Sequence, residues 1–434
     1  MNIIERAKAF VQSLRELAGR SAWDWRRCPR CGDNDTVKHG AYARRPWFLT
    51  GRRTVKVQRH KCNRCSSQGG ISTYSERSPL LIRGSWYARE VRRYSIDLWQ
   101  HGRSSLRRTA ELVRSLLGHQ ERWLLWCPLD EPPAESEQCR FNAKTVHRWL
   151  DWAGIEAQRT VEGQLEGVAS SGQLGTDGLW AKLRGGTKRV VLVLVDSVSG
   201  LIWPPVVVEG EESQASWKKL FQRASQAGLD LQKVRGVAGD GARGLLAYLS
   251  RELEWVNQQR CVFHIWRNLG AELARQASEA AKGLVGEAAE AVRKQTRREL
   301  VALIRGILDA QSEEQAQAGL AKLAAHRLGA RLAQMIQENL DAALVHLSWY
   351  NEGLMRVAPE CVWRDFRLRV SRGRNHGSDE RLERASLVWG VYENFTPAQR
   401  RSERKRHYRR PGKSRLEAAG SPQYETSYLD ALSV

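Results

Sequence analysis

Three carboxylates stand at positions in the chain where they could bind a divalent metal together. Asp177 lies in the run Thr-Asp-Gly and Asp240 in the run Gly-Asp-Gly, and each closes a short apolar stretch that is expected to be a strand. The third is Glu383, which is followed by Arg384. Hard divalent cations take oxygen ligands, and a pair of them can hold the attacking and the leaving oxygen of a phosphodiester. The three acids therefore predict a metal-dependent reaction on a phosphodiester.

The charge of the chain favours the same class of substrate. Its 434 residues include 70 Lys and Arg against 48 Asp and Glu, which gives a net charge of +22 and a pI of about 10.0. A polyanionic partner is expected, and nucleic acid is the first candidate. No apolar run reaches the roughly 18 residues of a membrane span, and an acid near the N-terminus argues against a signal peptide. We expect a cytoplasmic, nucleoid-associated protein without membrane contact.

Two Cys-x-x-Cys pairs predict a structural metal site. Cys28 and Cys31 form the first pair, and Cys62 and Cys65 form the second, about thirty residues later. Each pair turns two sulfurs toward one ion, and four thiolates around Zn²⁺ form a closed tetrahedral site. We expect a zinc ribbon over residues 21–75, with metal binding supplying on the order of 10 kcal/mol of folding energy. A redox dithiol is the alternative.

Helical periodicity surrounds this ribbon on both sides. A short amphipathic helix is expected over residues 1–20, and a three-helix module over residues 80–155. Its third helix begins near Asn142, a suitable N-cap, and ends near Gly154; an insertion from Gly118 to Arg140 precedes it. A helix-turn-helix module would offer this helix to a DNA groove, with a plain packing domain as the alternative. The side chains that would contact DNA are Lys144, Thr145, His147 and Arg148.

From about residue 170 the pattern changes to strands. The expected strands cover Leu174–Leu183, Arg189–Asp196, Leu201–Val208, Val234–Ala238 and Arg260–Phe263. Helices are expected at Ser213–Ala227 and Ala242–Leu253. The resulting order, β-β-β-α-β-α-β, is that of the ribonuclease H fold. Asp196 also ends a strand, but the run Asp-Ser-Val-Ser-Gly indicates a hairpin turn residue.

The rest of the chain completes a multidomain α+β protein. The ribonuclease H-like α/β core takes residues 170–265, and an all-helical insertion takes residues 266–370, where Ala, Leu, Glu, Arg and Gln recur with helical periodicity. A final catalytic helix over residues 371–398 carries the third acid. A basic tail over residues 399–434 follows, with nine Lys and Arg between Arg400 and Arg415. It would bind DNA backbone nonspecifically, or it is a solvated tail.

A further motif lies about twenty residues after Asp240. Cys261 and His264 form a Cys-x-x-His step in the run Gln-Arg-Cys-Val-Phe-His. With the two aspartates and the Glu-Arg step, this layout resembles the DDE transposases of bacterial insertion sequences, in the branch related to Mutator-like elements. The resemblance covers nearly the whole chain. The chain departs from the family at the third motif, which usually reads Asn-x-x-Glu-Arg. This chain has Glu380 at the position of the Asn. Glu380 is therefore the alternative to Glu383 as the third acid.

The resemblance implies DNA transposition. Asp177, Asp240 and Glu383 would hold two Mg²⁺ or Mn²⁺ ions, and Cys261 and His264 would support the active site. The enzyme would cleave DNA at the terminal inverted repeats of an insertion sequence and join the freed ends to target DNA, as a homodimer or larger assembly. Two alternatives stay open: a zinc-ribbon DNA-binding regulator with an inactive ribonuclease H-like domain, and a ribonuclease H-like nuclease that only cuts.

Overall fold

The computed structural model describes residues 27–102, 104–118, 141–165, 167–349, 360–370, 376–397, 412–421 and 427–432. The chain divides between Leu150 and Asp151 into two compact units. Among the described residues, no helix has both the length and the apolar character needed to cross a bilayer. The helix predicted over residues 1–20 and the insertion predicted between Gly118 and Arg140 lie outside the described residues.

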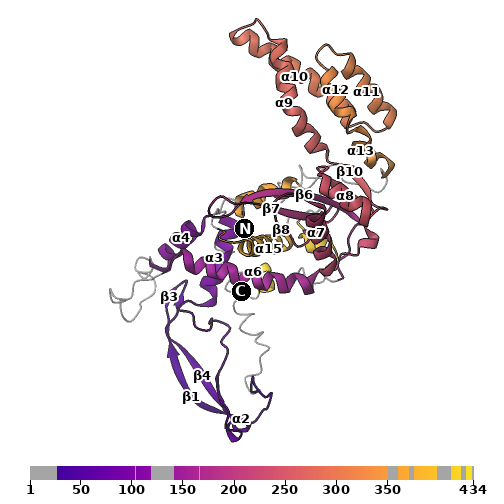
Figure 1. Cartoon of the computed structure of the whole chain (residues 1–434). Coiled ribbons are helices and arrows are strands. Elements are labelled where there is room, and N and C mark those ends of the chain that lie inside the picture. The colour runs from indigo at the N-terminus through magenta and orange to yellow at the C-terminus, as the bar shows by residue number, and fades with distance from the viewer. Residues whose placement is uncertain are drawn as a thin grey trace. The chain divides into compact units, whose positions relative to one another are not determined.

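The first unit begins with a long antiparallel ribbon, seen in Figure 1 as β1 and β4. β1 (Thr36–Arg44) pairs with β4 (Val55–Cys62), which also pairs with β5 (Thr73–Ser75). Between them come the paired β2 (Trp47–Phe48) and β3 (Gly51–Arg52), and the short helix α2 (Asn63–Ser67) follows β4. Because side chains along most of β1 are exposed, the ribbon buries little apolar surface and needs another source of stability.

Three helices follow the ribbon, as predicted: α3 (Arg89–Gly102), α4 (Leu106–Gly118) and α6 (Ala143–Gln164). The third is longer than expected, because Gly154 does not end it. A Cβ at residue 154 would lie 2.9 Å from the Cα of Arg384. Gly154 therefore does not end α6. Its missing side chain allows α6 to pack closely against the later helix that contains Arg384. That the three helices act as a helix-turn-helix module stays a prediction.

A mixed sheet of five strands forms the centre of the second unit, in the spatial order β10-β9-β6-β7-β8. β7 is antiparallel to both β6 and β8, whereas β9 is parallel to β6 and to β10. Apolar residues fill most of β7, and they are buried on both of its faces, as expected of an interior strand. The strands are β6 (Gln173–Lys182), β7 (Lys188–Asp196), β8 (Val206–Glu209), β9 (Gly236–Gly239) and β10 (Asn257–Arg260).

Two of these strands differ from the prediction. The stretch Leu201–Val208 was expected to be one strand, but β8 begins only at Val206, because Pro204 and Pro205 have no N–H to donate to a ladder. The strand predicted over Arg260–Phe263 is β10, which ends at Arg260. The polar run Asn-Gln-Gln-Arg gives no apolar strand signal, and pairing with β9 alone defines it.

Two helices and a turn of 3-10 helix connect the strands. α7 (Gln214–Gln226) and α8 (Arg243–Glu252) confirm the two predicted helices, and η3 (Leu231–Lys233) precedes β9. The hydroxyl of Ser213 accepts a hydrogen bond from the backbone N–H of Ser216 and caps the N-terminus of α7, which stabilises a helix by about 1 kcal/mol.

The helical insertion has an apolar core of its own and lies at the upper end of the view in Figure 1. It begins at Val262 rather than near residue 266. The side chain of Gln259 anchors it to β10, donating to Ala343 O and accepting from the N–H of His346, both at 2.8 Å. The helices are α9 (Val262–Ala280), α10 (Gly286–Leu308), α11 (Glu313–Ala325), α12 (Ala330–Gln337), α13 (Leu340–Leu344) and η4 (Val345–Trp349).

The C-terminal helices return to the sheet: α14 (Glu360–Arg369), α15 (Asp379–Phe395), α17 (Arg415–Ala418) and α18 (Tyr428–Ala431). Arg415, predicted as part of the basic tail, is buried instead. It donates to Gly200 O at 2.7 Å and pairs with Glu393 at 3.2 Å. Arg415 therefore belongs to the core of the second unit, while the tail from Arg400 to Arg410 lies outside the described residues.

Asp196 is a hairpin turn residue, as predicted. Its replacement is expected to lower the free energy of unfolding substantially. Its fully buried carboxylate accepts bonds from the N–H and hydroxyl groups of Ser171 and Ser199, among others. Asp196→Ala leaves these donors without an acceptor, so we expect the free energy of unfolding to fall by about 3 kcal/mol. Native-state hydrogen exchange of the β6 and β7 amides measures this, with the exposed Glu254→Ala as control. A loss below about 1 kcal/mol would contradict the assignment.

Candidate functional site

Asp177 and Asp240 come together where β9 ends beside β6: Asp240 directly follows β9, as predicted, whereas Asp177 lies in the middle of β6 rather than closing it. The register of β6 and β9 pairs Leu174 with Val237 and Gly175 with Ala238. Continued by two residues, it brings Asp177 level with Asp240, which directly follows β9. Neighbouring strands lie about 4.8 Å apart, and residues at one level of a parallel pair face the same side. Two carboxylates from distant segments thus lie side by side at the point where β9 ends and β6 continues.

Local hydrogen bonds hold each aspartate. Asp177 is buried, with 6% of its surface exposed, and its Oδ1 accepts from the N–H of Gly178 at 2.9 Å. Asp240 is half-buried, and its Oδ1 accepts from the N–H of Ala242 at 2.8 Å, just before α8. Each of these bonds uses Oδ1, and Oδ2 of Asp177 contacts a histidine instead.

That histidine is His264, the second residue of the Cys-x-x-His step. Its Nε2 lies 3.9 Å from Oδ2 of Asp177, and its side chain is 2% exposed. Cys261 is also buried, and its backbone N–H donates to Gly239 O at 2.8 Å. The step therefore fastens the start of α9 to the end of β9, beside Asp240, and brings an imidazole to Asp177.

A basic group lies beside the turn that follows Asp240. Gly241 has a φ of +79°, and a Cβ at this residue would come within 3.0 Å of Nε of Arg260. The guanidinium of Arg260, at the end of β10, therefore lies against this turn. Guanidinium groups make strong, charge-assisted hydrogen bonds to phosphate oxygens, so Arg260 is a candidate contact for a phosphate near Asp240.

The third predicted acid lies in a different environment. Glu383 forms an ion pair with Arg223 of α7, and both line a pocket of about 330 Å³ whose lining includes neither Asp177 nor Asp240. Glu380 is exposed. Among the described residues, the three predicted acids do not form a cluster with mutually close ligand atoms.

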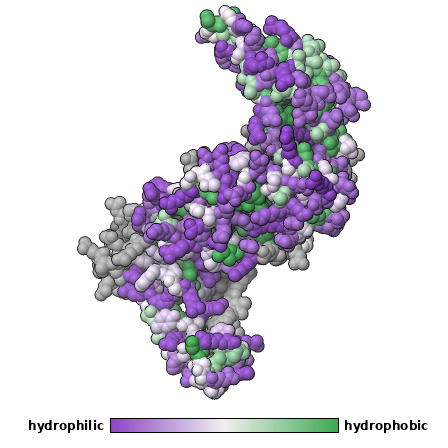
Figure 2. Space-filling view, viewed as in Figure 1, coloured by the Kyte–Doolittle hydropathy of each residue, from purple (hydrophilic) through white to green (hydrophobic). Residues whose placement is uncertain are grey.

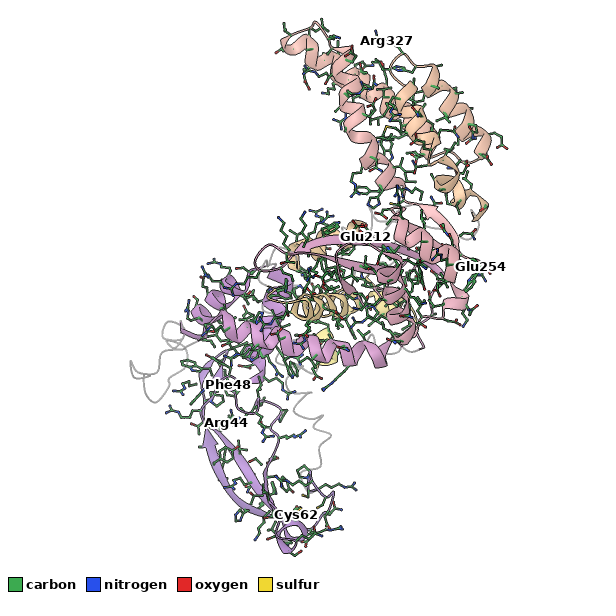
Figure 3. All side chains as sticks on the ribbon, in the orientation of Figure 1. Arg44, Phe48, Cys62, Glu212, Glu254 and Arg327 are labelled. Carbon is green, nitrogen blue, oxygen red and sulfur yellow. The ribbon has the colours of Figure 1, made fainter. Side chains whose placement is uncertain are left out.

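Another acid, Glu212, lies near Asp240 and was not among the residues predicted from the sequence. Glu212 lies in the loop between β8 and α7, where Figure 3 labels it. Burial, and then the negative charge of Asp240, raise the pKa of Glu212 to about 7. Its run Glu-Gly-Glu-Glu-Ser suggests only an exposed acidic loop. The signal that could have found it is indirect: Gly178 directly follows Asp177, Gly244 lies four residues after Asp240, and these two glycines leave room for Glu212 and its neighbour Ser213.

The residues around Asp177 and Asp240 fit a hard divalent cation. Carboxylate oxygens are the ligands that Mg²⁺ and Mn²⁺ take in proteins. In addition, Oε2 of Glu212 is buried without a hydrogen-bond partner in the part of the chain that the structure describes. A buried carboxylate oxygen is costly unless a positive charge or donor satisfies it. The donor set therefore suits the predicted cofactor.

The four predicted cysteines form a separate cluster. Their Sγ atoms all lie within 4.8 Å of one another, including 3.8 Å from Cys28 to Cys65 and 3.6 Å from Cys31 to Cys62. Four sulfurs about 2.3 Å from a zinc ion would be about 3.8 Å apart. The thiol of Cys31, and then burial, raise the pKa of Cys65 to about 12, so a bound cation would favour the thiolate form of Cys65. Figure 3 shows Cys62 at the end of the ribbon away from Phe48.

The predicted DNA-contacting residues divide into two groups on α6. Lys144 and Arg148 are exposed and one helical turn apart, so they share a face of the helix, whereas Thr145 and His147 are half-buried. Hydrophilic residues dominate the face of the molecule seen in Figure 2, in keeping with the excess of Lys and Arg. An exposed basic pair on a helix can contact phosphates.

Residues 205–353 match a family model described as Transposase, Mutator family. Over these residues, the predicted resemblance to Mutator-family transposases is confirmed. The Mutator-like segment contains Glu212, Asp240, Cys261 and His264 together with the helical insertion. Asp177, Glu383 and the four cysteines lie outside it, so the match bears on only part of the candidate site.

One curated relative supports the same assignment. The chain is similar to the transposase for insertion sequence element IS905 of Lactococcus lactis subsp. lactis (strain IL1403), with 38% identity over 64 residues. The aligned segment is 15% of this chain and spans 16% of the relative's length. Both comparisons thus show similarity of parts of this chain to transposases.

Proposed function

We propose that this chain is a transposase that cleaves DNA at the ends of an insertion sequence and joins the freed 3′ ends to target DNA. The observation that carries the proposal is the register of β6 and β9, which brings Asp177 level with Asp240 where β9 ends, in a chain with a Mutator-like segment. The strand order supports it, because three antiparallel strands followed by two parallel ones is what a ribonuclease H-like core requires.

Asp177 and Asp240 are the proposed ligands of two Mg²⁺ or Mn²⁺ ions, with Glu383 as the third acid implied by the resemblance. Bound divalent cations would activate water or a 3′-hydroxyl and stabilise the leaving oxygen. The chain itself would position the scissile phosphate, with Arg260 as a basic contact beside Asp240. To join the site, Glu383 has to leave its ion pair with Arg223.

The first unit is the proposed DNA-recognition part. The cysteine cluster would hold one structural Zn²⁺ at the end of the ribbon. The three helices would read terminal inverted repeats, with Lys144 and Arg148 of α6 contacting the backbone or a groove. Because transposition has to bring two DNA ends together, we propose a homodimer or larger assembly on DNA.

Cleavage of element ends tests the proposal. The purified chain is incubated with labelled DNA carrying the two ends of its own insertion sequence, with Mg²⁺, with Mn²⁺ or with EDTA. We expect new 3′ ends at the element boundary in either metal and none in EDTA. Binding of the ends without cleavage in either metal would contradict the proposal and favour a DNA-binding regulator.

His264 is expected to act by positioning Asp177. His264→Ala removes the imidazole 3.9 Å from Oδ2 of Asp177, and loss of a group that orients a ligand typically costs 10- to 100-fold, so we expect cleavage to slow by about that factor. The Mg²⁺ concentration for half-maximal cleavage should rise, and His264→Asn, which keeps a polar group, should restore part of the rate. An unchanged Mg²⁺ dependence in His264→Ala would contradict this role.

A further inference from the structure

The side chain of Glu212 lies directly over the residue that follows Asp177. A Cβ at Gly178 would come within 2.6 Å of the Cδ of Glu212, a separation that real Cβ atoms do not show. The carboxyl group therefore occupies the space that a side chain at residue 178 would need. This places Glu212 next to the strand that carries Asp177.

A second glycine brings the same loop against the helix that follows Asp240. A Cβ at Gly244, in the first turn of α8, would lie 2.6 Å from the backbone carbon of Ser213. Ser213 in turn caps α7. The backbone of Glu212 is thus held between a helix cap on one side and α8 on the other. Gly178 and Gly244 together fix Glu212 between the segments of the two aspartates.

The electrostatics of this position favour a cation. The negative charge of Asp240 disfavours the charged form of Glu212. The Oε2 atom of Glu212 is buried without a hydrogen-bond partner among the described residues. Within the same described ranges, no Lys or Arg forms an ion pair with Glu212. Glu383, in contrast, has the guanidinium of Arg223. A half-buried carboxylate close to the negative charge of Asp240 is costly unless a positive ion offsets the two charges.

We propose that Glu212 is a carboxylate ligand of the divalent cation that binds at Asp177 and Asp240. This inference rests on the proposed function, since it takes the metal at those aspartates as given. It adds a ligand that belongs to neither predicted aspartate motif and comes from the start of α7. In this arrangement, the three carboxylates are supplied by β6, the end of β9 and the loop before α7, and the ion would draw together ligand atoms that do not form a close group among the described residues.

Metal binding tests the inference without any reaction. Isothermal titration calorimetry of the full-length, zinc-loaded chain with Mn²⁺, in the absence of DNA, gives the affinity directly. We expect Glu212→Gln to weaken Mn²⁺ binding at least about tenfold, since even residues that only support a ligand cost this much. Glu211→Gln, an exposed acid one residue away, is the matched control and should bind as wild type.

A second variant guards against an effect of Glu212→Gln on folding. Gly178→Ala keeps every carboxylate but displaces Glu212, so it too should weaken Mn²⁺ binding. Thermal melting provides the folding control: without divalent metal, Glu212→Gln should melt no lower than wild type, because it removes a charge that burial disfavours. Added Mn²⁺ should raise the melting temperature of wild type more than that of Glu212→Gln.

The outcomes separate this inference from the proposed function. If Asp177→Asn and Asp240→Asn lose Mn²⁺ binding while Glu212→Gln keeps it, the inference is overturned and the proposed site stands. The same holds if Glu383→Gln weakens binding and Glu212→Gln does not. If both aspartate variants bind Mn²⁺ like wild type, the proposed metal site itself fails.

Discussion

Asp240→Asn is expected to abolish DNA cleavage while leaving DNA binding within a few fold of wild type. The substitution keeps the size of the side chain and can keep the bond to the N–H of Ala242, but a neutral amide lacks the negative charge with which a carboxylate binds Mg²⁺. We expect the cleavage rate to fall by more than about 100-fold, beyond what loss of a supporting residue costs. Gel-based cleavage and fluorescence anisotropy on the same end DNA measure the two properties.

The control for this prediction is Glu254→Gln. Glu254 is exposed and follows α8 by two residues, so it has the same charge change without a place beside Asp177. It should cleave and bind like wild type. If Asp240→Asn loses DNA binding to the same degree as cleavage, Asp240 has a structural role in capping the start of α8, and the metal-ligand assignment is wrong.

Cys62→Ser is expected to remove the bound zinc and unfold the ribbon. Cys62 is fully buried, ends β4 and is the N-cap of α2. Structural zinc supplies on the order of 10 kcal/mol to a small site of this kind, and β1 buries too little to replace it. We expect about one zinc per wild-type chain by elemental analysis and none in the variant, with rapid hydrogen exchange throughout β1 and β4.

Cys261→Ser is the matched control for the zinc prediction. Cys261 is also fully buried, but it stands at the start of α9, outside the four-cysteine cluster. Its zinc content should equal that of wild type. Wild-type chain without zinc, or a Cys62→Ser variant that keeps it, would remove the structural zinc from the account and favour the redox dithiol.

Local patterns predicted the parts of the fold that depend on neighbouring residues. The spacing of Cys28, Cys31, Cys62 and Cys65 predicted a cluster because each pair lies within one turn. Alternating and continuous apolar runs predicted β6 and β7, since burial of one or both faces needs them. The turn at Asp196 followed from Ser and Gly in the same run.

What the sequence could not supply depends on tertiary packing. Gly154 resembles a helix end, and only the approach of Arg384 shows why α6 continues through it. The polar strand β10 is defined by pairing with β9 alone. Glu212 lies in an acidic loop, and its place against β6 and α8 requires glycines from two other segments, Gly178 and Gly244. The residue pattern of a single segment cannot predict which other segments pack against it.

Strand transfer is the measurement that tests the central claim most directly. The purified chain is mixed with labelled insertion-sequence ends and a target plasmid, and covalent joining of the 3′ ends to the plasmid is scored by sequencing of the junctions. The account predicts joined product in Mg²⁺ or Mn²⁺, none in EDTA, and none for Asp177→Asn or Asp240→Asn. Cleaved ends that are never joined, or joining that survives both substitutions, would contradict it.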